Sequence, residues 1–168
     1  MAGFAKARAG GLTNRLAAMT VLMAGLLAAP AVSATEYRSR EAKAITAWVD
    51  AMAERVGRDG LVRTLKGTRV GDWHRPELGL YIFVFETNGT LRAHPNARMI
   101  GHDIRPTQGA RGRPYVNEII QALDESGDAV WVGYDGWDPK TKRVRAKRTY
   151  ARRIGLLILA CGYFLDET

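Results

Sequence analysis

The stretch LYIFVFETNGTLRAHP (80–95) constrains the fold most strongly, because it contains two strand-like runs joined through Asn88-Gly89. This dipeptide tolerates the positive φ values of a tight hairpin turn better than other pairs do. In the first run, residues 80–85, both alternating faces are apolar, which is typical of a strand in the middle of a sheet. The stretch therefore predicts an antiparallel hairpin whose first strand is buried on both sides.

The second run of this hairpin ends in a histidine that precedes a proline. Leu91 and Ala93 alternate with Arg92 and His94. Because successive residues of a strand point to opposite faces, we expect His94 on the face away from Leu91 and Ala93. This position at the strand end makes His94 a candidate binding residue.

Three more strand patterns follow, over residues 129–134, 143–153 and 154–164. The last is again apolar on both faces, so we place it in the centre of the sheet, beside the first strand of the hairpin. Helical spacing of apolar residues predicts two amphipathic helices, with the stripes Ile45, Trp48, Val49, Met52, Val56 and Val116, Ile119, Ile120, Leu123. Together these patterns predict an α+β, PAS-like domain: a five-stranded antiparallel sheet with a long N-terminal helix and a helix-bearing crossover.

The first 34 residues have the pattern of a secretory signal peptide. Lys6, Arg8 and Arg15 precede an uncharged stretch, 16–29, and small residues then lead to a predicted cleavage after Ala34. The uncharged stretch makes roughly 21 Å of helix against about 30 Å of bilayer hydrocarbon, which disfavours a permanent span. We therefore expect a periplasmic or secreted protein with no transmembrane anchor after cleavage.

The remaining residues, 35–168, are long enough for one domain with a core. We divide them into an N-terminal helical region, 35–66, and a region of sheet and ligand pocket, 78–168. Loss of the signal peptide lowers the formal net charge from +8 to +5, because it carries three of the 25 basic residues and none of the 17 acidic ones.

No motif places residues for catalysis or for metal binding. Cys161 is the only cysteine, and in its apolar run a thiol behaves as a small hydrophobic side chain. No nucleophile lies in a recognisable motif. The spacing of the possible metal ligands matches no known pattern; they are His74, His94, His102, Asp72 and Asp103. The sequence therefore predicts neither an enzyme nor a bound metal or other cofactor.

The order of the motifs resembles a single Cache domain of the second type, an extracytoplasmic small-molecule sensor module of bacteria. The resemblance covers nearly all of 35–168 and rests on a glycine-terminated helix followed by LGLYIFVFETNGTLRAHP, the IG of RMIGHDI, GRPYVNEII, GDAVWVGYDGWDP, KRTY and CGYFLD. Two segments depart from the family pattern. RPTQGARG stands where the family usually has an acidic residue and a glycine, and GWDP carries an extra glycine relative to the usual Tyr-x-Trp-x-Pro.

The resemblance implies a pocket on one face of the sheet that binds a small organic acid such as acetate, propionate, pyruvate or lactate. A carboxylate removed from water needs cationic, N–H or O–H donors, and a short aliphatic tail needs aromatic walls. The candidates of these types are His94, Lys147 and the hydroxyls of Tyr115, Tyr134 and Tyr150 as donors, with Trp137 as wall. Each aromatic candidate has an alternative role in ordinary packing.

Two of these candidates lie three residues apart on one strand. In a strictly alternating strand, Lys147 faces solvent with Arg143 and Arg145 while Tyr150 points the other way. A β-bulge between Lys147 and Tyr150 would bring both to the pocket.

The stretch 137–153 holds eight Lys or Arg residues, and two functions compete to explain it. One is binding of a polyanion or of the anionic membrane surface. The other, which we favour, is a sensor or transport-accessory module that binds no nucleic acid and acts through a separate membrane kinase, chemoreceptor or transporter. In that case the arginines are solvated charges on an outer strand: Arg143, Arg145, Arg148, Arg152 and Arg153.

Overall fold

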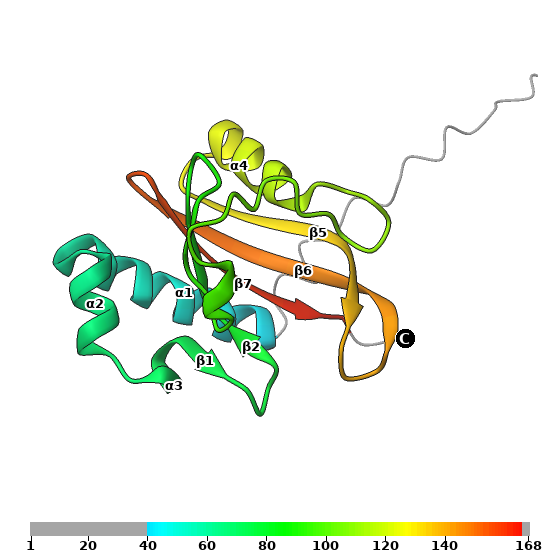
Figure 1. Cartoon of the computed structure of the whole chain (residues 1–168), viewed down its shortest axis with the longest axis horizontal. Helices are drawn as coiled ribbons and strands as arrows, with labels where there is room; N and C mark the ends of the chain where they lie inside the picture. The colour runs from blue at the N-terminus through cyan, green and yellow to red at the C-terminus, as the bar shows by residue number, and fades with distance from the viewer. Residues whose placement is uncertain (1–39, 166–168) are drawn as a thin grey trace, which may run out of the picture. The chain divides into compact units, whose positions relative to one another are not determined.

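A computed structural model of the chain describes residues 40–165. The predicted signal peptide, 1–34, and its cleavage site lie outside these residues. The elements follow one another in this order (Figure 1): α1 (Arg40–Asp59), α2 (Leu61–Gly67), α3 (Val70–Trp73), β1 (His74–Arg75), β2 (Leu80–Tyr81), β3 (Phe83–Glu86), β4 (Leu91–Ala93), the short 3-10 helix η2 (Ala97–Met99), α4 (Tyr115–Ser126), β5 (Ala129–Asp138), β6 (Arg143–Ile154) and β7 (Leu157–Phe164). Within residues 40–165, no helix is both long and apolar enough to cross a membrane.

The main sheet has five antiparallel strands in the order β4-β3-β7-β6-β5. Helix α1 packs on one face and α4 on the other, as Figure 1 shows. Strands β3 and β7 lie side by side in the centre, because both carry apolar residues on both faces. The predicted α+β, PAS-like fold is thereby confirmed.

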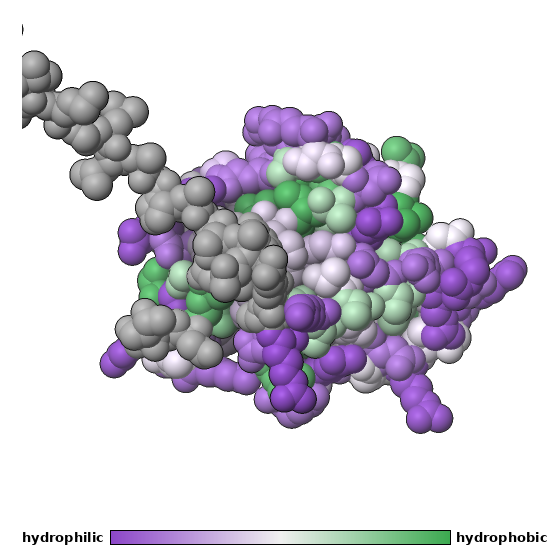
Figure 2. Space-filling model, turned by 180° about the vertical axis from the view of Figure 1, so that it is seen from behind, coloured by the Kyte–Doolittle hydropathy of each residue, from purple (hydrophilic) through white to green (hydrophobic). Residues whose placement is uncertain are grey.

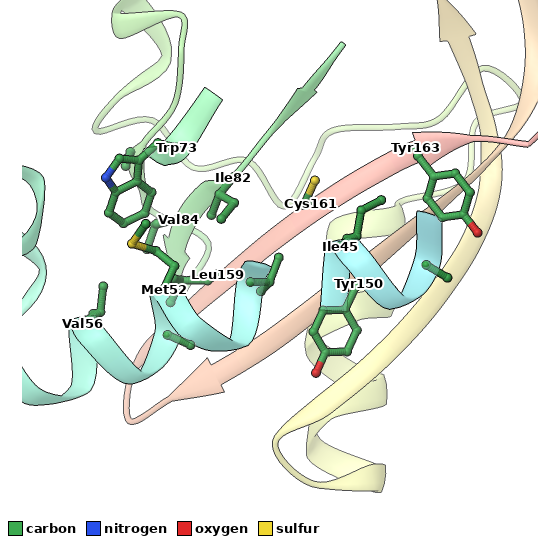
Figure 3. Packing of buried hydrophobic residues seen from close by; sticks show 14 residues of the cluster. Ile45, Met52, Val56, Trp73, Ile82, Val84, Tyr150, Leu159, Cys161 and Tyr163 are labelled. Atoms are coloured by element: carbon green, nitrogen blue, oxygen red, sulfur yellow. The ribbon is translucent and has the colours of Figure 1, made fainter. Parts of the chain in front are cut away.

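Helix α1 covers its face with apolar residues at helical spacing (Figure 3). Ile45, Val49, Met52 and Val56 are at most 7% exposed. Their partners on the sheet include Val84, Tyr150, Leu159 and Cys161. Full burial of one side chain of this size contributes roughly 1.5 to 3 kcal/mol, so this face is a main source of stability.

Three glycines and a proline in the segment GTRVGDWHRPELG (67–79) favour a loop, but the segment contains α3 and the two-residue strand β1. Strand β1 pairs with β2. The indole of Trp73 is buried, and its Nε1 donates to Thr68 Oγ1 at 2.6 Å. The backbone N–H of Ile82 donates to the carbonyl of Trp73 at 2.8 Å. These tertiary contacts order a segment whose glycines and proline break any local periodicity.

The β3–β4 hairpin forms, but its turn differs from the predicted one. Gly89 has φ +89°, whereas Asn88 does not take a positive φ. The pairing also shifts register between Val84 and Phe85. This bulge sends Leu91 to the α4 face and Ala93 to the α1 face. The expectation that His94 faces away from both was therefore wrong for Leu91, whose side of the sheet it shares.

Strand β6 is not an outer strand, because it pairs with β5 along one side and with β7 along the other. Its arginines are correspondingly not all solvated. Arg148 is 7% exposed. Arg145 forms an ion pair with Asp138 at 2.7 Å, and Arg153 forms one with Asp124 at 2.7 Å. The sequence misled us here because a run of charge suggests an edge, whereas these charges have partners in the fold.

The outer edge of β5 is partly covered by the segment RPTQGARG. The backbone N–H of Ala110 donates to the carbonyl of Asp135 at 2.6 Å. Gly109 permits this approach, because a Cβ atom there would lie 2.7 Å from the same carbonyl oxygen. This departure from the family pattern therefore brings the loop before α4 against the sheet.

Candidate functional site

Polar side chains gather on the α4 face of the sheet, near the ends of β2, β4 and β7. We call this group the α4-face cluster; its members are Tyr81, His94, Tyr115, Tyr134, Lys147 and Thr149. It includes four of the six residues predicted from sequence: His94, Tyr115, Tyr134 and Lys147. None of the six is an acid, so the cluster offers hydrogen-bond donors and a cation without a carboxylate of its own.

Lys147 reaches this cluster across two glycines. A Cβ atom on Gly136 of β5 would lie 3.3 Å from Lys147 Cδ, and one on Gly162 of β7 would lie 2.8 Å from Lys147 Cε. The Lys147 ammonium lies 5.0 Å from the centre of the Phe164 ring. Within residues 40–165 it has no ion-pair partner. Burial lowers the pKa of Lys147 from its usual 10.5.

Three of the six members of the cluster are tyrosines, and Tyr134 is the cross-strand partner of Lys147. The rings of Tyr115 and Tyr134 are stacked with their centres 4.2 Å apart, and Tyr134 Oη shares a hydrogen bond of 3.1 Å with Thr149 Oγ1. Burial, with a smaller effect of Tyr81, raises the pKa of Tyr115 to about 12. Burial also raises the pKa values of Tyr81 and Tyr134. All three hydroxyls therefore stay protonated at neutral pH and can donate hydrogen bonds.

His94 completes the cluster from the end of β4. Its ring lies 5.0 Å from that of Tyr81, and its Nδ1 accepts the backbone N–H of Asn96 at 2.9 Å. The neutral ring therefore carries its proton on Nε2, which is left as a donor. Burial lowers the pKa of His94, and the charge of Lys147 lowers it further. The neutral imidazole is thus the favoured form beside this lysine.

A small cavity of about 30 Å³ lies beside the cluster. It is lined by Tyr81, Phe83, Leu91, His94, Met99, Ile104, Thr107 and Tyr115. This volume is close to the space that one water molecule occupies in the liquid. An apolar wall from β3, β4 and the segment after β4 therefore adjoins the polar donors.

Three larger clefts lie on the surface. One, of about 590 Å³, lies between the first turns of α1, the β1–β2 turn and the β5–β6 turn. A second, of about 420 Å³, lies between α2, α3 and β4 and is lined in part by His94. The third, of about 670 Å³, lies beside α2 and the adjoining ends of β3, β4 and β7. Volume alone does not select a binding site, and we favour the α4-face cluster because it combines a largely buried cation with convergent hydroxyl and imidazole donors.

Tyr150 and Trp137 do not join the cluster. The β5–β6 register runs without interruption from Ala129↔Arg152 to Asp138↔Arg143, so the bulge that would bring both Lys147 and Tyr150 to the pocket is absent there. Tyr150 consequently lies on the α1 face, where its hydroxyl donates to Asp50 Oδ1 at 2.8 Å (Figure 3). Lys147 lies on the other face, opposite Tyr134.

Trp137 lies three residues after Tyr134 on the same strand, and it is 58% exposed. A strand alternates with a period of two, so the extra glycine of GWDP changes which residue points to the α4 face. Gly136 takes that position, and the side chains of Lys147 and Phe164 lie where its Cβ would point. Trp137 is therefore directed to the opposite face.

Two members of the cluster were not predicted as site residues. Tyr81 shares a face of the first strand run with Phe83 and Phe85, and Thr149 is two residues from Lys147 on β6. Strict alternation along each strand would have placed both on the site face. For Thr149, considering a bulge between Lys147 and Tyr150 hid the fact that alternation places it on the same face as Lys147.

Neither a metal centre nor a reactive thiol is indicated. Among residues 40–165, no group of three or more His, Cys, Asp or Glu side chains is arranged to hold a metal ion. Burial raises the pKa of the Cys161 thiol to about 12. A thiol in that state is a poor nucleophile at neutral pH.

Comparison with known proteins gives one family. The sequence profile of the Cache domain matches residues 44–168. A search of curated proteins found no significant match.

Three solved structures share the fold. A periplasmic sensor domain of a chemotaxis protein has a TM-score of 0.54 at 16% identity and covers 74% of this chain and 90% of its own. A Cache chemosensory domain studied for carboxylic acid recognition has a TM-score of 0.58 at 18% identity, covering 80% and 99%. A methyl-accepting chemotaxis protein from Vibrio parahaemolyticus has a TM-score of 0.58 at 15% identity, covering 79% and 93%.

Proposed function

The chain belongs to the Cache domain family, and from this premise we propose that it is an extracytoplasmic sensing or binding module for a small organic acid. Two of the similar structures come from chemotaxis proteins, and a third is a chemosensory domain that recognises carboxylic acids. A binding role without catalysis fits the α4-face cluster, which has a cation and donors but neither a nucleophile nor a carboxylate pair.

The observation that carries this proposal is Lys147, a partly buried lysine that forms no ion pair within residues 40–165, although the charge of Asp138 acts on it from a distance. A partly buried cation of this kind is costly unless an anion pairs with it. We assign Lys147 to the carboxylate of the ligand. His94 Nε2 and the hydroxyls of Tyr115 and Tyr134 are the donors for the remaining lone pairs of the carboxylate, and a charge-assisted hydrogen bond is about twice as strong as a neutral one.

The small cavity beside the cluster favours an acid with a short chain. Phe83, Leu91 and Met99 line its apolar side, and its volume is about 30 Å³. Acetate, propionate, pyruvate and lactate are the acids we propose, and each requires an outward shift of the segment after β4. The half-buried side chain of Met99 is the flexible part of that wall.

We further propose that a separate membrane protein receives the signal or the ligand. A chemoreceptor fits best, because the similar structures include chemotaxis receptors. A membrane kinase or a transporter would fulfil the same role. Periplasmic or secreted localisation, with cleavage after Ala34, belongs to this proposal.

A thermal-shift screen with acetate, propionate, pyruvate and lactate tests acid binding, with urea and glycine as uncharged and zwitterionic contrasts. At a ligand concentration near 100 times the dissociation constant, binding to the folded state adds about 2.7 kcal/mol of stability. At least one acid is therefore expected to raise the melting temperature clearly. A flat response to all four acids would refute the proposal.

Titration calorimetry of Lys147→Met then tests the assignment of the charged end. Removing one partner of a buried charge-assisted contact costs about 2 to 5 kcal/mol, so affinity should fall roughly 30-fold or more. Lys66→Met is the matched control, because Lys66 is exposed on α2. Binding by Lys147→Met that equals binding by Lys66→Met would remove Lys147 from the site.

A further inference from the structure

The end of the sheet that carries the β5–β6 turn exposes three large apolar side chains. Trp137 is 58% exposed, Val144 is 45% exposed and Leu78 is 56% exposed. Trp137 and Val144 are direct cross-strand partners of β5 and β6, and Leu78 lies in the β1–β2 turn. A tryptophan on an open strand surface contributes little to folding, so its exposure calls for another explanation.

Two hairpin turns come together at this end. A Cβ atom on Gly79 would lie 3.1 Å from Lys140 Nζ, so the lysine of one turn lies over the other. Leu78, Gly79, Pro139 and Lys140 line the same cleft. In Figure 1 the β5–β6 turn projects away from α2, at the opposite end of the sheet from the β6–β7 turn. We name this surface the basic tip; it consists of Leu78, Trp137, Lys140, Lys142 and Val144.

The charge of the basic tip is positive. Lys140 and Lys142 are exposed in the β5–β6 turn. The one acid of that turn, Asp138, is 2% exposed and accepts hydrogen bonds from Arg145, from the Lys140 backbone and from Thr141. Its charge is therefore directed inward. Glu77, which is exposed in the β1–β2 turn, offsets one of the two lysine charges, so the tip keeps a net positive charge.

We propose that the basic tip docks on the surface of a bilayer that contains anionic lipids. Tryptophan is enriched at membrane interfaces, where its ring lies at the level of the headgroups. Lysines close to an anionic leaflet strengthen binding by roughly fivefold each. The tip therefore combines two components of interfacial binding, while acid binding at the α4-face cluster plays no part in it.

A protein partner fits this surface less well. Lysine is depleted in protein–protein interfaces, whose cores are continuous and apolar. Here the lysines lie in the β5–β6 turn, whose flanking strands carry Trp137 and Val144, and Leu78 lies in the second turn. A fluid bilayer accommodates such a projection without a matching cavity. On the side of the molecule shown in Figure 2, hydrophobic side chains likewise form only small, separate patches among hydrophilic ones.

Flotation with lipid vesicles tests the proposal. Purified protein is mixed at low salt with vesicles of equimolar phosphatidylcholine and phosphatidylserine, and in parallel with phosphatidylcholine alone. We expect association with the anionic vesicles only, weakening steeply as salt is added. Lys140→Gln with Lys142→Gln should weaken it roughly 25-fold, and Trp137→Ser by at least about fivefold.

Leu156→Ser is the matched control, because Leu156 is 74% exposed in the β6–β7 turn at the other end of the sheet. Its vesicle association should equal that of the wild type, and all variants should keep the wild-type melting temperature. Because every variant has the same N-terminus, differences in vesicle association between the variants reflect the basic tip alone. Absent association with anionic vesicles, or equal association by Trp137→Ser and wild type, would overturn the proposal.

Discussion

Arg145 and Lys147 lie two residues apart on the same side of β6, yet their surroundings differ. Arg145 donates to Asp138 Oδ2 at 2.7 Å and to the carbonyl of Leu165 at 2.5 Å. Lys147 has no such partner within residues 40–165 and lies over the ring of Phe164, which Arg145 also approaches. One cation is neutralised within the fold, whereas the other is the one that we propose pairs with the carboxylate of a ligand.

This difference separates a structural charge from a binding charge. Arg145 fixes the β5–β6 turn through Asp138, which also accepts the Lys140 backbone N–H and the Thr141 hydroxyl. Lys147 holds no comparable turn in place. The lack of side chains at two neighbouring glycines, Gly136 and Gly162, leaves space for its aliphatic part. Burial does not distinguish the two residues, because both are partly buried; the presence of a carboxylate partner does.

The largest loss of stability is expected from Arg145→Met. The variant leaves the Asp138 carboxylate, whose side chain is 3% exposed, without its cationic partner. Removing one member of a buried pair leaves an uncompensated charge and is far more harmful than removing a neutral hydrogen bond. Urea unfolding should show a much lower midpoint than for Lys142→Met in the adjacent turn. Equal midpoints would mean that the pair does not hold the turn.

Acid should abolish the same contribution. Arg145, followed by weaker effects of the neighbouring hydrogen bonds, lowers the pKa of Asp138 from 3.8 to about 2. Because the folded pKa lies below the unfolded one, the stabilisation is complete above about pH 4 and is lost as pH falls toward 2. Urea midpoints measured across this range should fall more steeply for the wild type than for Arg145→Met. If the urea midpoints of the two proteins fall equally between pH 4 and pH 2, the contribution does not come from Asp138.

The sequence predicted the fold well because the fold depends on patterns of short range. Two strands apolar on both faces belong in the centre of a sheet, and the stripe from Ile45 to Val56 defines the helix that covers one face. These signals do not depend on register. The place of β6 in the sheet was mistaken, since the partners of its arginines come from distant segments such as Asp124 on α4.

The site was predicted less well, because membership depends on the face to which each side chain points. The bulge at Val84 changed the side of Leu91, and the absent bulge in β6 separated Tyr150 from Lys147. One inserted glycine moved Trp137 to the other face. In each case a shift of one residue along the strand decides the face to which a side chain points. The alternation of hydrophobic and polar residues is too weak in these segments to predict that shift.

A smaller effect, of opposite sign, is expected for Lys147→Met. Replacing a buried cation that lacks a partner with an apolar side chain of similar length removes a desolvation cost, so the ligand-free protein should gain about 1 kcal/mol. Burial lowers the pKa of Lys147, which means that the folded state disfavours the charged form. The gain should therefore shrink as pH rises toward 10.5, where the wild-type lysine loses its proton in both states.

Urea unfolding without ligand, at neutral and at alkaline pH, checks this expectation. Lys66→Met, on the exposed side of α2, should change stability by less than about 0.5 kcal/mol at either pH. A clear loss of stability in Lys147→Met would show that the lysine supports the fold, and its role as a binding charge would then be in doubt.

The smallest effect on acid binding is expected for Tyr150→Phe, and it tests the separation of the two faces directly. The substitution removes the hydrogen bond to Asp50 but keeps the ring beside Trp131, with 5.2 Å between the ring centres. Loss of one such hydrogen bond costs about 1 kcal/mol, and acid affinity should stay at the wild-type value because Tyr150 lies on the α1 face. Tyr134→Phe is its counterpart on the α4 face, where the lost hydroxyl belongs to the cluster, so this variant should bind acid more weakly. Calorimetry on both variants decides between the faces: a drop in affinity for Tyr150→Phe as large as that for Tyr134→Phe would mean that the two tyrosines serve one pocket after all.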